Sequence, residues 1–168
     1  MNSRPHVPEA PRPRADGRLA ALIGVPAATA LLATIALWEG YEPTGYRDIV
    51  GVPTACWGDT AGVEVGRTYG RAECEARLER QALAHAEPVL RCTPGLAGRP
   101  NQLIAAASLA YNIGAHAYCR STAARRFNAG DMRGGCDALL MWNRAGGRVV
   151  RGLANRRRFE REICLRGL

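Results

Sequence analysis

Two acids and one hydroxyl stand close together in the sequence, at positions that could flank a single chemical bond. Glu39 follows an uncharged stretch that ends at Trp38, Asp48 comes nine residues later, and Thr54 comes six residues after that. A carboxyl group kept protonated can donate a proton to a leaving oxygen. A second, ionised carboxylate can activate water or stabilise positive charge on a sugar. This combination suits the hydrolysis of a glycosidic bond.

The local sequence favours different roles for the two acids. The end of a helix and an apolar neighbour such as Trp38 both disfavour a charged carboxylate, which favours Glu39 as the proton donor. Asp48 stands beside Arg47 in a polar turn, so we expect it to stay ionised. The hydroxyl of Thr54 could hold the attacking water. Spacing alone is a weak signal, because two acids nine residues apart are more often surface charges.

The residues around these acids resemble the catalytic segment of glycoside hydrolase family 24, the T-even phage lysozymes and lambdoid phage endolysins. The shared pattern is Glu39-Gly40, Tyr46-Arg47-Asp48 and Gly51-Val52-Pro53-Thr54, with no gap between the three polar residues. Further along, SLAYNIGA at 108–115 looks like the family helix that closes the cleft. The stretch WNRAGGRVVRGLANRRRFEREICL at 142–165 looks like the lambdoid C-terminal block. The resemblance extends over residues 36–167.

The resemblance implies a muramidase that hydrolyses the β-1,4 bond between N-acetylmuramic acid and N-acetylglucosamine in bacterial peptidoglycan and so lyses the host cell. It implies Glu39 as general acid, Asp48 as general base or electrostatic partner, and Thr54 as the residue that positions water. Family membership also implies inversion at the anomeric carbon. We expect no cofactor and no metal, and a protein that acts as a monomer.

Three further residues are assigned to substrate binding by the same resemblance. Tyr46 belongs to the catalytic pattern, Asn112 matches a position that contacts the glycan, and Arg156 is expected to pair with Glu39 across the cleft. The T-even enzymes carry Gln at the position of Asn112 and have no cysteine at that of Cys56. A surface arginine and a helix-capping asparagine are the alternative interpretations of Arg156 and Asn112.

The elements that must position these residues are mostly helical. Composition and stop signals predict helices over 71–90, ending near Pro88 and Pro94, over 100–113, around 121–129 and 131–142, and over 152–164 with arginines on its outer face. Residues 44–66 are rich in Gly, Thr, Val and aromatic residues and predict a small β-hairpin region. The expected fold class is α+β and lysozyme-like, with the antiparallel hairpin lining the active-site cleft.

An uncharged segment of twenty residues, 19–38, precedes Glu39. Twenty residues are long enough to cross a bilayer as a helix, but Ala, Gly, Pro and Thr make this segment only weakly apolar. A cleaved signal peptide, a permanent anchor and a releasable signal anchor are all compatible with it, whereas Gly24 and Pro26 argue against one continuous buried core helix. The Ala, Gly and Thr content favours the release type, and the segment resembles that of signal-anchor-release endolysins. In the membrane it would keep Glu39 away from an incomplete cleft.

This interpretation divides the chain into a disordered basic cytoplasmic tail over 1–18, the signal anchor over 19–38 and a catalytic domain over 39–168. Arginines before the apolar segment favour a cytoplasmic N-terminus. The catalytic domain would then lie in the periplasm, held at the host inner membrane until release.

The six cysteines lie at positions 56, 74, 92, 119, 136 and 164, too far apart for zinc-binding motifs. An even number of scattered cysteines fits three disulfides in an oxidising compartment, although six free thiols are also compatible. Pairing Cys136 with Cys164 would join the last two helices, and pairing Cys92 with Cys119 would bracket the central helix. Cys56 and Cys74 would remain. Spacing proves none of these pairs.

The net charge of +8 is concentrated at the C-terminal end, where residues 120–168 hold twelve arginines and four acids. A basic region suits any polyanion, so a membrane-tethered, non-catalytic module that binds cell wall or nucleic acid is the alternative function. No helix-turn-helix or RNA-binding signature supports nucleic acid as a partner. The serines at 3, 108 and 121 lie in no GxSxG motif, which argues against a serine hydrolase.

Overall fold

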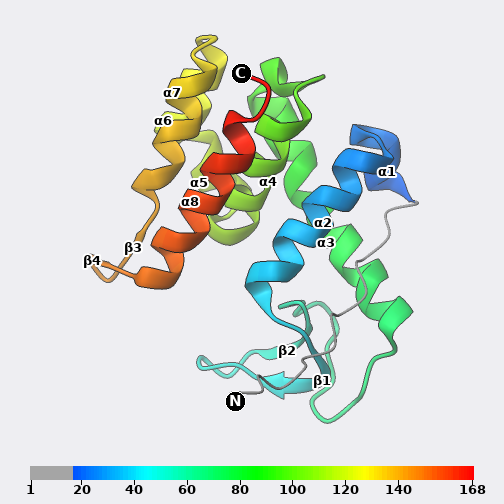
Figure 1. Cartoon of the computed structure of the whole chain (residues 1–168). Coiled ribbons are helices and arrows are strands. Elements are labelled where there is room, and N and C mark those ends of the chain that lie inside the picture. The colour runs from blue at the N-terminus through cyan, green and yellow to red at the C-terminus, as the bar shows by residue number, and fades with distance from the viewer. Residues whose placement is uncertain (1–16) are drawn as a thin grey trace, which may run out of the picture.

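The computed structural model describes residues 17–168 (Figure 1). Its helices are α1 (Arg18–Ile23), α2 (Val25–Glu39), α3 (Arg71–Cys92), α4 (Pro100–Ile113), α5 (Ala115–Cys119), α6 (Thr122–Asn128), α7 (Met132–Ala138) and α8 (Arg151–Leu165), with 3-10 turns η1 (Pro94–Leu96) and η2 (Leu139–Met141). The strands are β1 (Glu42–Arg47), β2 (Pro53–Cys56), β3 (Arg144–Ala145) and β4 (Arg148–Val149). The predicted α+β class with a predominance of helix is confirmed.

Strands β1 and β2 form an antiparallel hairpin directly after the helix that ends at Glu39. Tyr46 pairs with Thr54, and Arg47 pairs with Pro53. The hairpin lies at one end of the molecule, and α3 runs from there to the helical end that holds α6 and α7 (Figure 1). The segment with Glu39 and Asp48 therefore lies where two parts of the protein meet. The small β part is the β1–β2 hairpin with the turn that follows it, and the larger helical part is the group of helices.

Helix α4 is the centre of the helical part. Its residues from Gln102 to Ala110 are all buried, and it contacts α2, α3 and α8. Five of these buried residues are alanines or Ser108, whose small side chains let the neighbouring helices approach closely. The predicted helix over 100–113, ending at Gly114, is confirmed, and every helix that positions the site packs against it.

The structure corrects several expected boundaries. Helix α3 continues through Pro88 to Cys92, because buried Ala86 and Val89 hold its last turns against the core and offset the hydrogen bond that proline removes. The helix expected around 131–142 ends at Ala138 and continues as the 3-10 turn η2. Helix α5 and the hairpin β3–β4 were not predicted.

The apolar segment forms two helices that are packed on the rest of the protein. Gly24, with φ of 85°, separates α1 from α2, and Leu19, Leu31, Leu32 and Ile35 are completely buried. Among the described helices, none has the length and apolar character to cross a bilayer. Of the tail expected over 1–18, residues 1–16 lie outside the described residues, and Arg18 begins α1.

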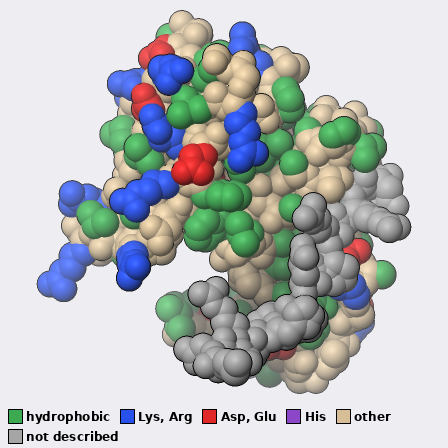
Figure 2. Space-filling model, in the orientation of Figure 1, with side chains coloured by type: hydrophobic (Ala, Val, Ile, Leu, Met, Phe, Trp, Pro, Cys, Tyr) green, Lys and Arg blue, Asp and Glu red, His purple; other side chains and the backbone are tan. Residues whose placement is uncertain are grey.

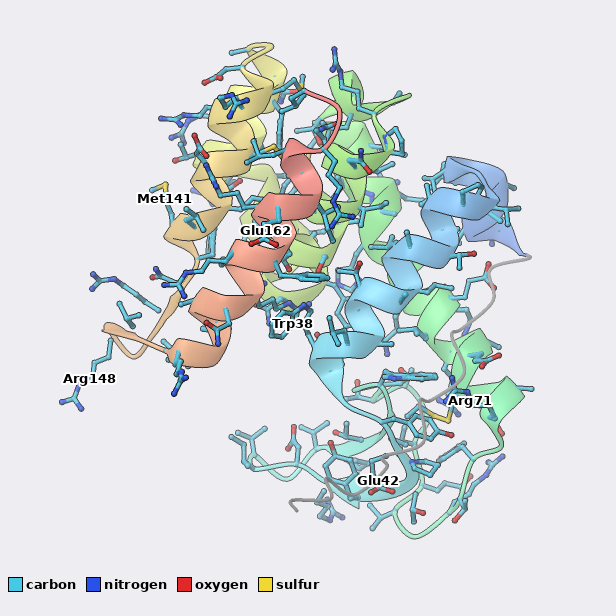
Figure 3. All side chains as sticks on the ribbon, viewed as in Figure 1. Trp38, Glu42, Arg71, Met141, Arg148 and Glu162 are labelled. Carbon is cyan, nitrogen blue, oxygen red and sulfur yellow. A yellow bond between two sulfur atoms is a disulfide. The ribbon has the colours of Figure 1, made fainter. Side chains whose placement is uncertain are left out.

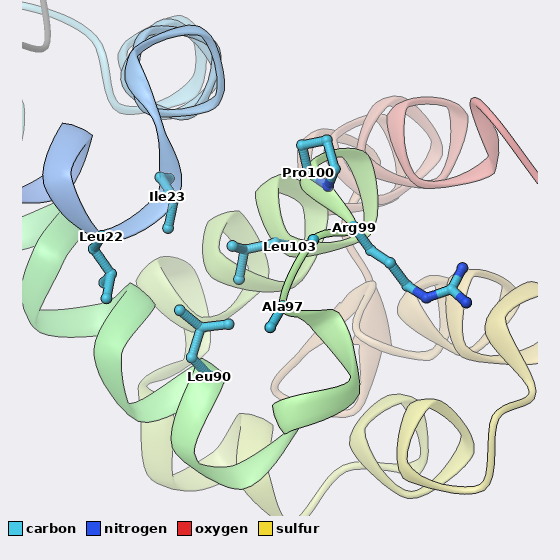
Figure 4. Close-up of a pocket in the computed structure, with 8 residues that line it drawn as sticks. Leu22, Ile23, Leu90, Ala97, Arg99, Pro100 and Leu103 are labelled. Carbon is cyan, nitrogen blue, oxygen red and sulfur yellow. The ribbon is translucent and has the colours of Figure 1, made fainter.

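The side of α1 that faces α3 and α4 is less closely packed than the buried face of α2. A pocket of about 230 Å³ separates Leu22 and Ile23 from Leu90 of α3 and Leu103 of α4 (Figure 4). Because the pocket walls lack partner atoms across the gap, α1 gains fewer van der Waals contacts than the buried face of α2 does.

All six cysteines lie in the described part of the chain and form three disulfides. The pairs are Cys56–Cys74, Cys92–Cys119 and Cys136–Cys164. The expected pairing is thus present: the first bond joins β2 to α3, the second joins the end of α3 to α5, and the third joins α7 to α8. The first disulfide thus ties the β1–β2 hairpin to a helix, and the other two tie helices to one another.

Candidate active site

Glu39 is the last residue of α2 and lies between the two parts of the protein. Its Oε1 accepts a hydrogen bond of 2.7 Å from Nη1 of Arg156 on α8. Its Oε2 faces the turn after β2, because a Cβ atom added to Gly58 would lie 3.8 Å from it. The side chain is 22% exposed, so the carboxyl group is held in place and still reached by solvent.

Asp48 lies in the tight turn between β1 and β2. Its Oδ1 accepts backbone hydrogen bonds from Val50 at 2.9 Å and Val52 at 2.8 Å. Arg47 closes the same turn through a 2.8 Å bond from Nη1 to the carbonyl of Gly51. Within residues 17–168, no hydrogen bond reaches Oδ2 of Asp48. One oxygen of this carboxylate therefore shapes the turn, and the other is available for water or a ligand.

Thr54 and Tyr46 face each other across the β1–β2 hairpin. Thr54 is buried, and its hydroxyl donates a 3.0 Å hydrogen bond to the carbonyl of Val52. This bond uses the hydroxyl proton and leaves the oxygen as an acceptor. The Tyr46 side chain is 41% exposed. The hairpin thus carries a buried hydroxyl and an exposed aromatic ring at paired positions.

A buried network of ion pairs lies behind Glu39. Arg156 donates through Nε to Glu160 at 3.1 Å and through Nη2 to the carbonyl of Ser108 at 3.3 Å. Glu160 is completely buried and also accepts from the Ser108 hydroxyl at 2.7 Å and pairs with Arg157 at 2.7 Å. The two arginines and two glutamates carry compensating charges, which limits the cost of burying them.

Burial raises the pKa of the Glu160 carboxyl group and lowers that of the Arg157 guanidinium group, and their ion pair opposes both shifts. The expectation that α8 presents its arginines outward is wrong for Arg157, which points into the protein and pairs with Glu160. Arg156 points inward as well and, as expected, reaches Glu39.

Asn112 is exposed on α4, and its Oδ1 accepts a 3.0 Å hydrogen bond from Nη1 of Arg157. Asn112 is therefore connected to Glu39 through Arg157, Glu160 and Arg156. The expected contact between Arg156 and Glu39 is present in the structure. A contact of Asn112 or Tyr46 with the glycan stays a prediction.

Figure 2 shows a hollow in the surface beside the part that carries β3, β4 and α8. Trp38 lies in the last turn of α2, beside α8 (Figure 3), and its ring packs edge-on against Phe159 of α8 with centroids 5.8 Å apart. In residues 17–168, no cluster of three or more His, Cys, Asp or Glu side chains could hold a metal ion.

Several residues around the site were not found by sequence reasoning. Glu160 and Ser108 are absent from the predicted set, and so is a second hydrogen-bonded group in which Asp59, Gln81 and Tyr111 lie near Trp57. The spacing of Arg156 and Glu160, four residues apart on one helix, is a signal for an ion pair. It could not reveal that the pair is buried.

A small antiparallel hairpin directly after α2, in a mostly helical fold, matches the lysozyme-like architecture of glycoside hydrolases that the sequence predicts. The phage lysozyme family model matches residues 36–160, and the chain belongs to this family. The predicted family and muramidase function are thereby confirmed.

Individual relatives support the same assignment. The SAR-endolysin of Enterobacteria phage P21 is 41% identical over 132 residues, which cover 77% of this chain and 78% of the relative. That of Pseudomonas phage phiKMV is 40% identical over 155 residues, which cover 86% and 91%. The active form of the P1 phage endolysin Lyz superposes with a TM-score of 0.73 at 25% identity and covers 83% of each chain.

Proposed function

We propose that Glu39 is the proton donor with which this muramidase cleaves the β-1,4 bond between N-acetylmuramic acid and N-acetylglucosamine. Asp48 is the ionised partner that acts as base or stabilises the sugar cation, and Thr54 holds the water. The position of Glu39 carries this proposal: Arg156 on α8 holds one oxygen, and the other faces Gly58 after β2. A sugar bound between the two parts of the protein would reach this carboxyl group.

Two hydrogen-bonding features of the hairpin support the other roles. The Oδ2 atom of Asp48 accepts no hydrogen bond within the described chain, and the Thr54 oxygen keeps its capacity to accept one from water. Tyr46, Asn112 and Arg156 complete the proposed substrate-binding set. Arg156 orients Glu39, and the exposed Tyr46 and Asn112 provide a ring and an amide for the glycan.

Arg156 holds one oxygen of Glu39, and the same guanidinium group is bound to the buried Glu160. Because Glu160 and the Ser108 carbonyl fix the guanidinium group in turn, Arg156 fixes the geometry of Glu39 in the free enzyme.

The substitution Glu39→Gln tests the proton donor. It keeps the shape and a hydrogen-bonding group but removes the acid, so we expect hydrolysis of purified peptidoglycan to fall by about 10²- to 10⁴-fold. The matched control is Glu42→Gln, which removes the same charge from an exposed position on β1. Circular dichroism checks that both variants fold. Full hydrolysis by Glu39→Gln would refute the proton donor, whereas binding to peptidoglycan without hydrolysis by the wild type would support the non-catalytic, wall-binding alternative.

Product analysis tests the reaction itself. Hydrolysis adds water and leaves reducing N-acetylmuramic acid ends, whereas a lytic transglycosylase leaves anhydro ends that are lighter by one water. We expect reducing ends, with inversion at the anomeric carbon. Anhydro products would contradict the roles proposed for Asp48 and Thr54.

We further propose that residues 19–38 anchor the newly made protein in the host inner membrane, with residues 1–18 in the cytoplasm and the domain over 39–168 in the periplasm. On release, the segment folds as α1 and α2 and delivers Glu39. Three observations support this proposal. Gly24 divides the segment into α1 and α2, and α1 borders a pocket of about 230 Å³. The match to the SAR-endolysin of phage phiKMV covers 91% of that relative.

Ala21 and Ala30 allow a direct test, because both are exposed and can be changed without disturbing the buried face of α1 and α2. Leucine at both positions strengthens the anchor, so we expect more protein in the membrane fraction and slower lysis. The purified variant should still hydrolyse isolated peptidoglycan. Serine at both positions is the matched control and should shift the protein toward the periplasm. Equal membrane fractions in all three proteins would contradict the proposal.

A further inference from the structure

A hydrogen bond that neither acid uses connects the two parts of the protein. The hydroxyl of Tyr111, on α4, lies 3.1 Å from the carbonyl oxygen of Trp57 and 2.8 Å from Oε1 of Gln81 on α3. The hydroxyl has one proton, which it directs toward these two acceptors. Trp57 belongs to the turn after β2. A side chain from the helical core therefore holds the backbone of the β part.

The backbone held in this way is the backbone that faces the acid. Trp57 directly precedes Gly58, where an added Cβ atom would lie 3.8 Å from Oε2 of Glu39. Trp57 is itself buried, and its ring packs against Tyr41 with centroids 4.7 Å apart. The turn has little freedom on its ring side. On its α4 side, the turn is held by the bond to Tyr111.

A second set of contacts orients Gln81. Its Nε2 donates to Oδ1 of Asp59, and Oδ2 of Asp59 accepts a 2.7 Å bond from Arg77. With its amide nitrogen committed to Asp59, Gln81 must present its oxygen to Tyr111. Asp59 is in turn paired with Ala55 of β2 through two backbone hydrogen bonds of 2.9 Å. The contacts thus lead from Trp57 through Tyr111 and Gln81 to Asp59, and both Trp57 and Asp59 belong to the β part.

The hydroxyl of Tyr111 also remains a donor under all working conditions. Burial raises the pKa of Tyr111 well above its ordinary value, and the nearby negative charges of Glu39 and Asp59 raise it further. The same coupling indicates that Tyr111 lies within electrostatic reach of the acid. A group with these properties maintains a fixed hydrogen bond and transfers no proton itself.

We propose that Tyr111 is a positioning residue for the muramidase reaction: its hydroxyl fixes the Trp57–Gly58 backbone against the carboxyl group of Glu39. The spacing between the acid on α2 and the water-holding Thr54 on β2 is thereby set from α4. This inference rests on the proposed role of Glu39. It assigns to Tyr111 no contact with the substrate.

The test compares the half-buried Tyr111 with the buried Tyr118. Tyr111→Phe keeps the ring, which packs on His85 with centroids 5.0 Å apart, and removes only the hydroxyl. Tyr118→Phe is the matched control: Tyr118 is buried, is bonded to Thr93 at 3.1 Å, and lies on α5. The first variant loses the contacts of the hydroxyl with Trp57 and Gln81, and the second loses the bond to Thr93. Only the first loses a bond to the turn that faces Glu39.

We expect Tyr111→Phe to lower kcat on soluble peptidoglycan fragments by about tenfold to a hundredfold, because small displacements of reacting groups have effects of that size. KM should change less than kcat. The pH dependence of kcat should shift as well, since the surroundings of Glu39 change. Tyr118→Phe should leave kcat and the pH profile as in the wild type. Circular dichroism confirms that each variant is folded at the assay temperature.

Gln81→Leu provides a second route that leaves the tyrosine intact. It removes one of the two acceptors of the Tyr111 hydroxyl and leaves the Trp57 carbonyl as the other, so kcat should fall less than in Tyr111→Phe, with less than additive effects in the double variant. Wild-type kcat in folded Tyr111→Phe, or equal losses in Tyr111→Phe and Tyr118→Phe, would overturn the inference. Full activity of Glu39→Gln is a separate result, because it would refute the proton donor whatever Tyr111 does.

Discussion

The two acids of the site are held by opposite means. Asp48 is held within its own turn, by backbone groups two and four residues away. Glu39 is held by Arg156, which is 117 residues away, and behind Arg156 stands a network of buried charges. A short stretch of sequence is sufficient to build the first arrangement. The second exists only after α2, α4 and α8 have packed together.

This difference predicts where the protein is vulnerable. A change in the turn should remain local, because few other contacts depend on it. A change in the buried network should affect the whole fold, because it leaves charges without partners in a medium that solvates them poorly. Substitutions on the two sides can therefore be ranked by their expected cost.

The largest effect is expected for Glu160→Ala. It leaves Arg156 and Arg157 buried without their shared carboxylate, and breaking a buried ion pair in this way costs about 3 to 5 kcal/mol of the free energy of unfolding. Urea unfolding measures the loss. Glu162→Ala is the control, because Glu162 is exposed on the same helix (Figure 3). Equal losses in both variants would show that the network contributes little.

The disulfides compare the two parts of the protein directly. Replacing Cys56 and Cys74 by serine frees β2 from α3, whereas replacing Cys136 and Cys164 frees α7 from α8. Each loss should destabilise the protein by about 2 to 4 kcal/mol in thermal unfolding. At a temperature where both variants are folded, the first should lose more activity, because β2 carries Thr54. Equal activities would indicate that β2 needs no covalent support.

Asp59 makes the β part sensitive to acid. Burial alone would raise the pKa of Asp59, but hydrogen bonds from Arg77, Gln81 and the backbone of Ala61 lower it overall. Its folded pKa thus lies below the unfolded value of about 3.9. The stabilisation is present above that value and is lost as the pH falls through the folded pKa.

Asp59→Asn should therefore lower the free energy of unfolding by about 1.5 to 3 kcal/mol at neutral pH, the usual contribution of hydrogen bonds to a charged group. The difference from the wild type should shrink as the pH is lowered from 6 to 2. Chemical unfolding over this range measures it. A difference that does not change with pH would show that the charge of Asp59 does not contribute.

The smallest effect on stability is expected at Asp48. Asp48→Ala removes the acceptor of two exposed backbone hydrogen bonds and should cost about 1 kcal/mol. Asp48→Asn keeps an acceptor oxygen and should be nearly as stable as the wild type. Both should lose most hydrolytic activity if the charge is needed. Retained activity in Asp48→Asn would remove Asp48 from the catalytic set without affecting the account of the turn.

The same contrast between local and long-range contacts separates what the sequence predicts from what it does not. The β1–β2 turn and the end of α4 at Gly114 depend on neighbouring residues, and both were predicted. The contact of Arg156 with Glu39 was expected only through a family resemblance, since nothing local connects residues so far apart. Ser108 and Glu160 lie 52 residues apart and were missed for that reason.

One missed element did have a local signal. Gly146 and Gly147 have φ values of 55° and 75°, the left-handed conformations of a two-residue hairpin turn between β3 and β4. The Gly-Gly pair was visible in the sequence. The strands around it have only two residues each and show no alternation of apolar and polar side chains, so their pattern could not support the turn.

The outer surface of α1 and α2 keeps Leu22, Val25 and Leu37 largely in water. Polar residues at these positions would increase the solubility of the folded protein. Each of them would also make the transfer of the segment into lipid less favourable. If one segment must satisfy both environments, its hydrophobicity is confined to a narrow interval. Natural variation along this surface should then exchange small apolar residues for one another and avoid both charges and long runs of leucine.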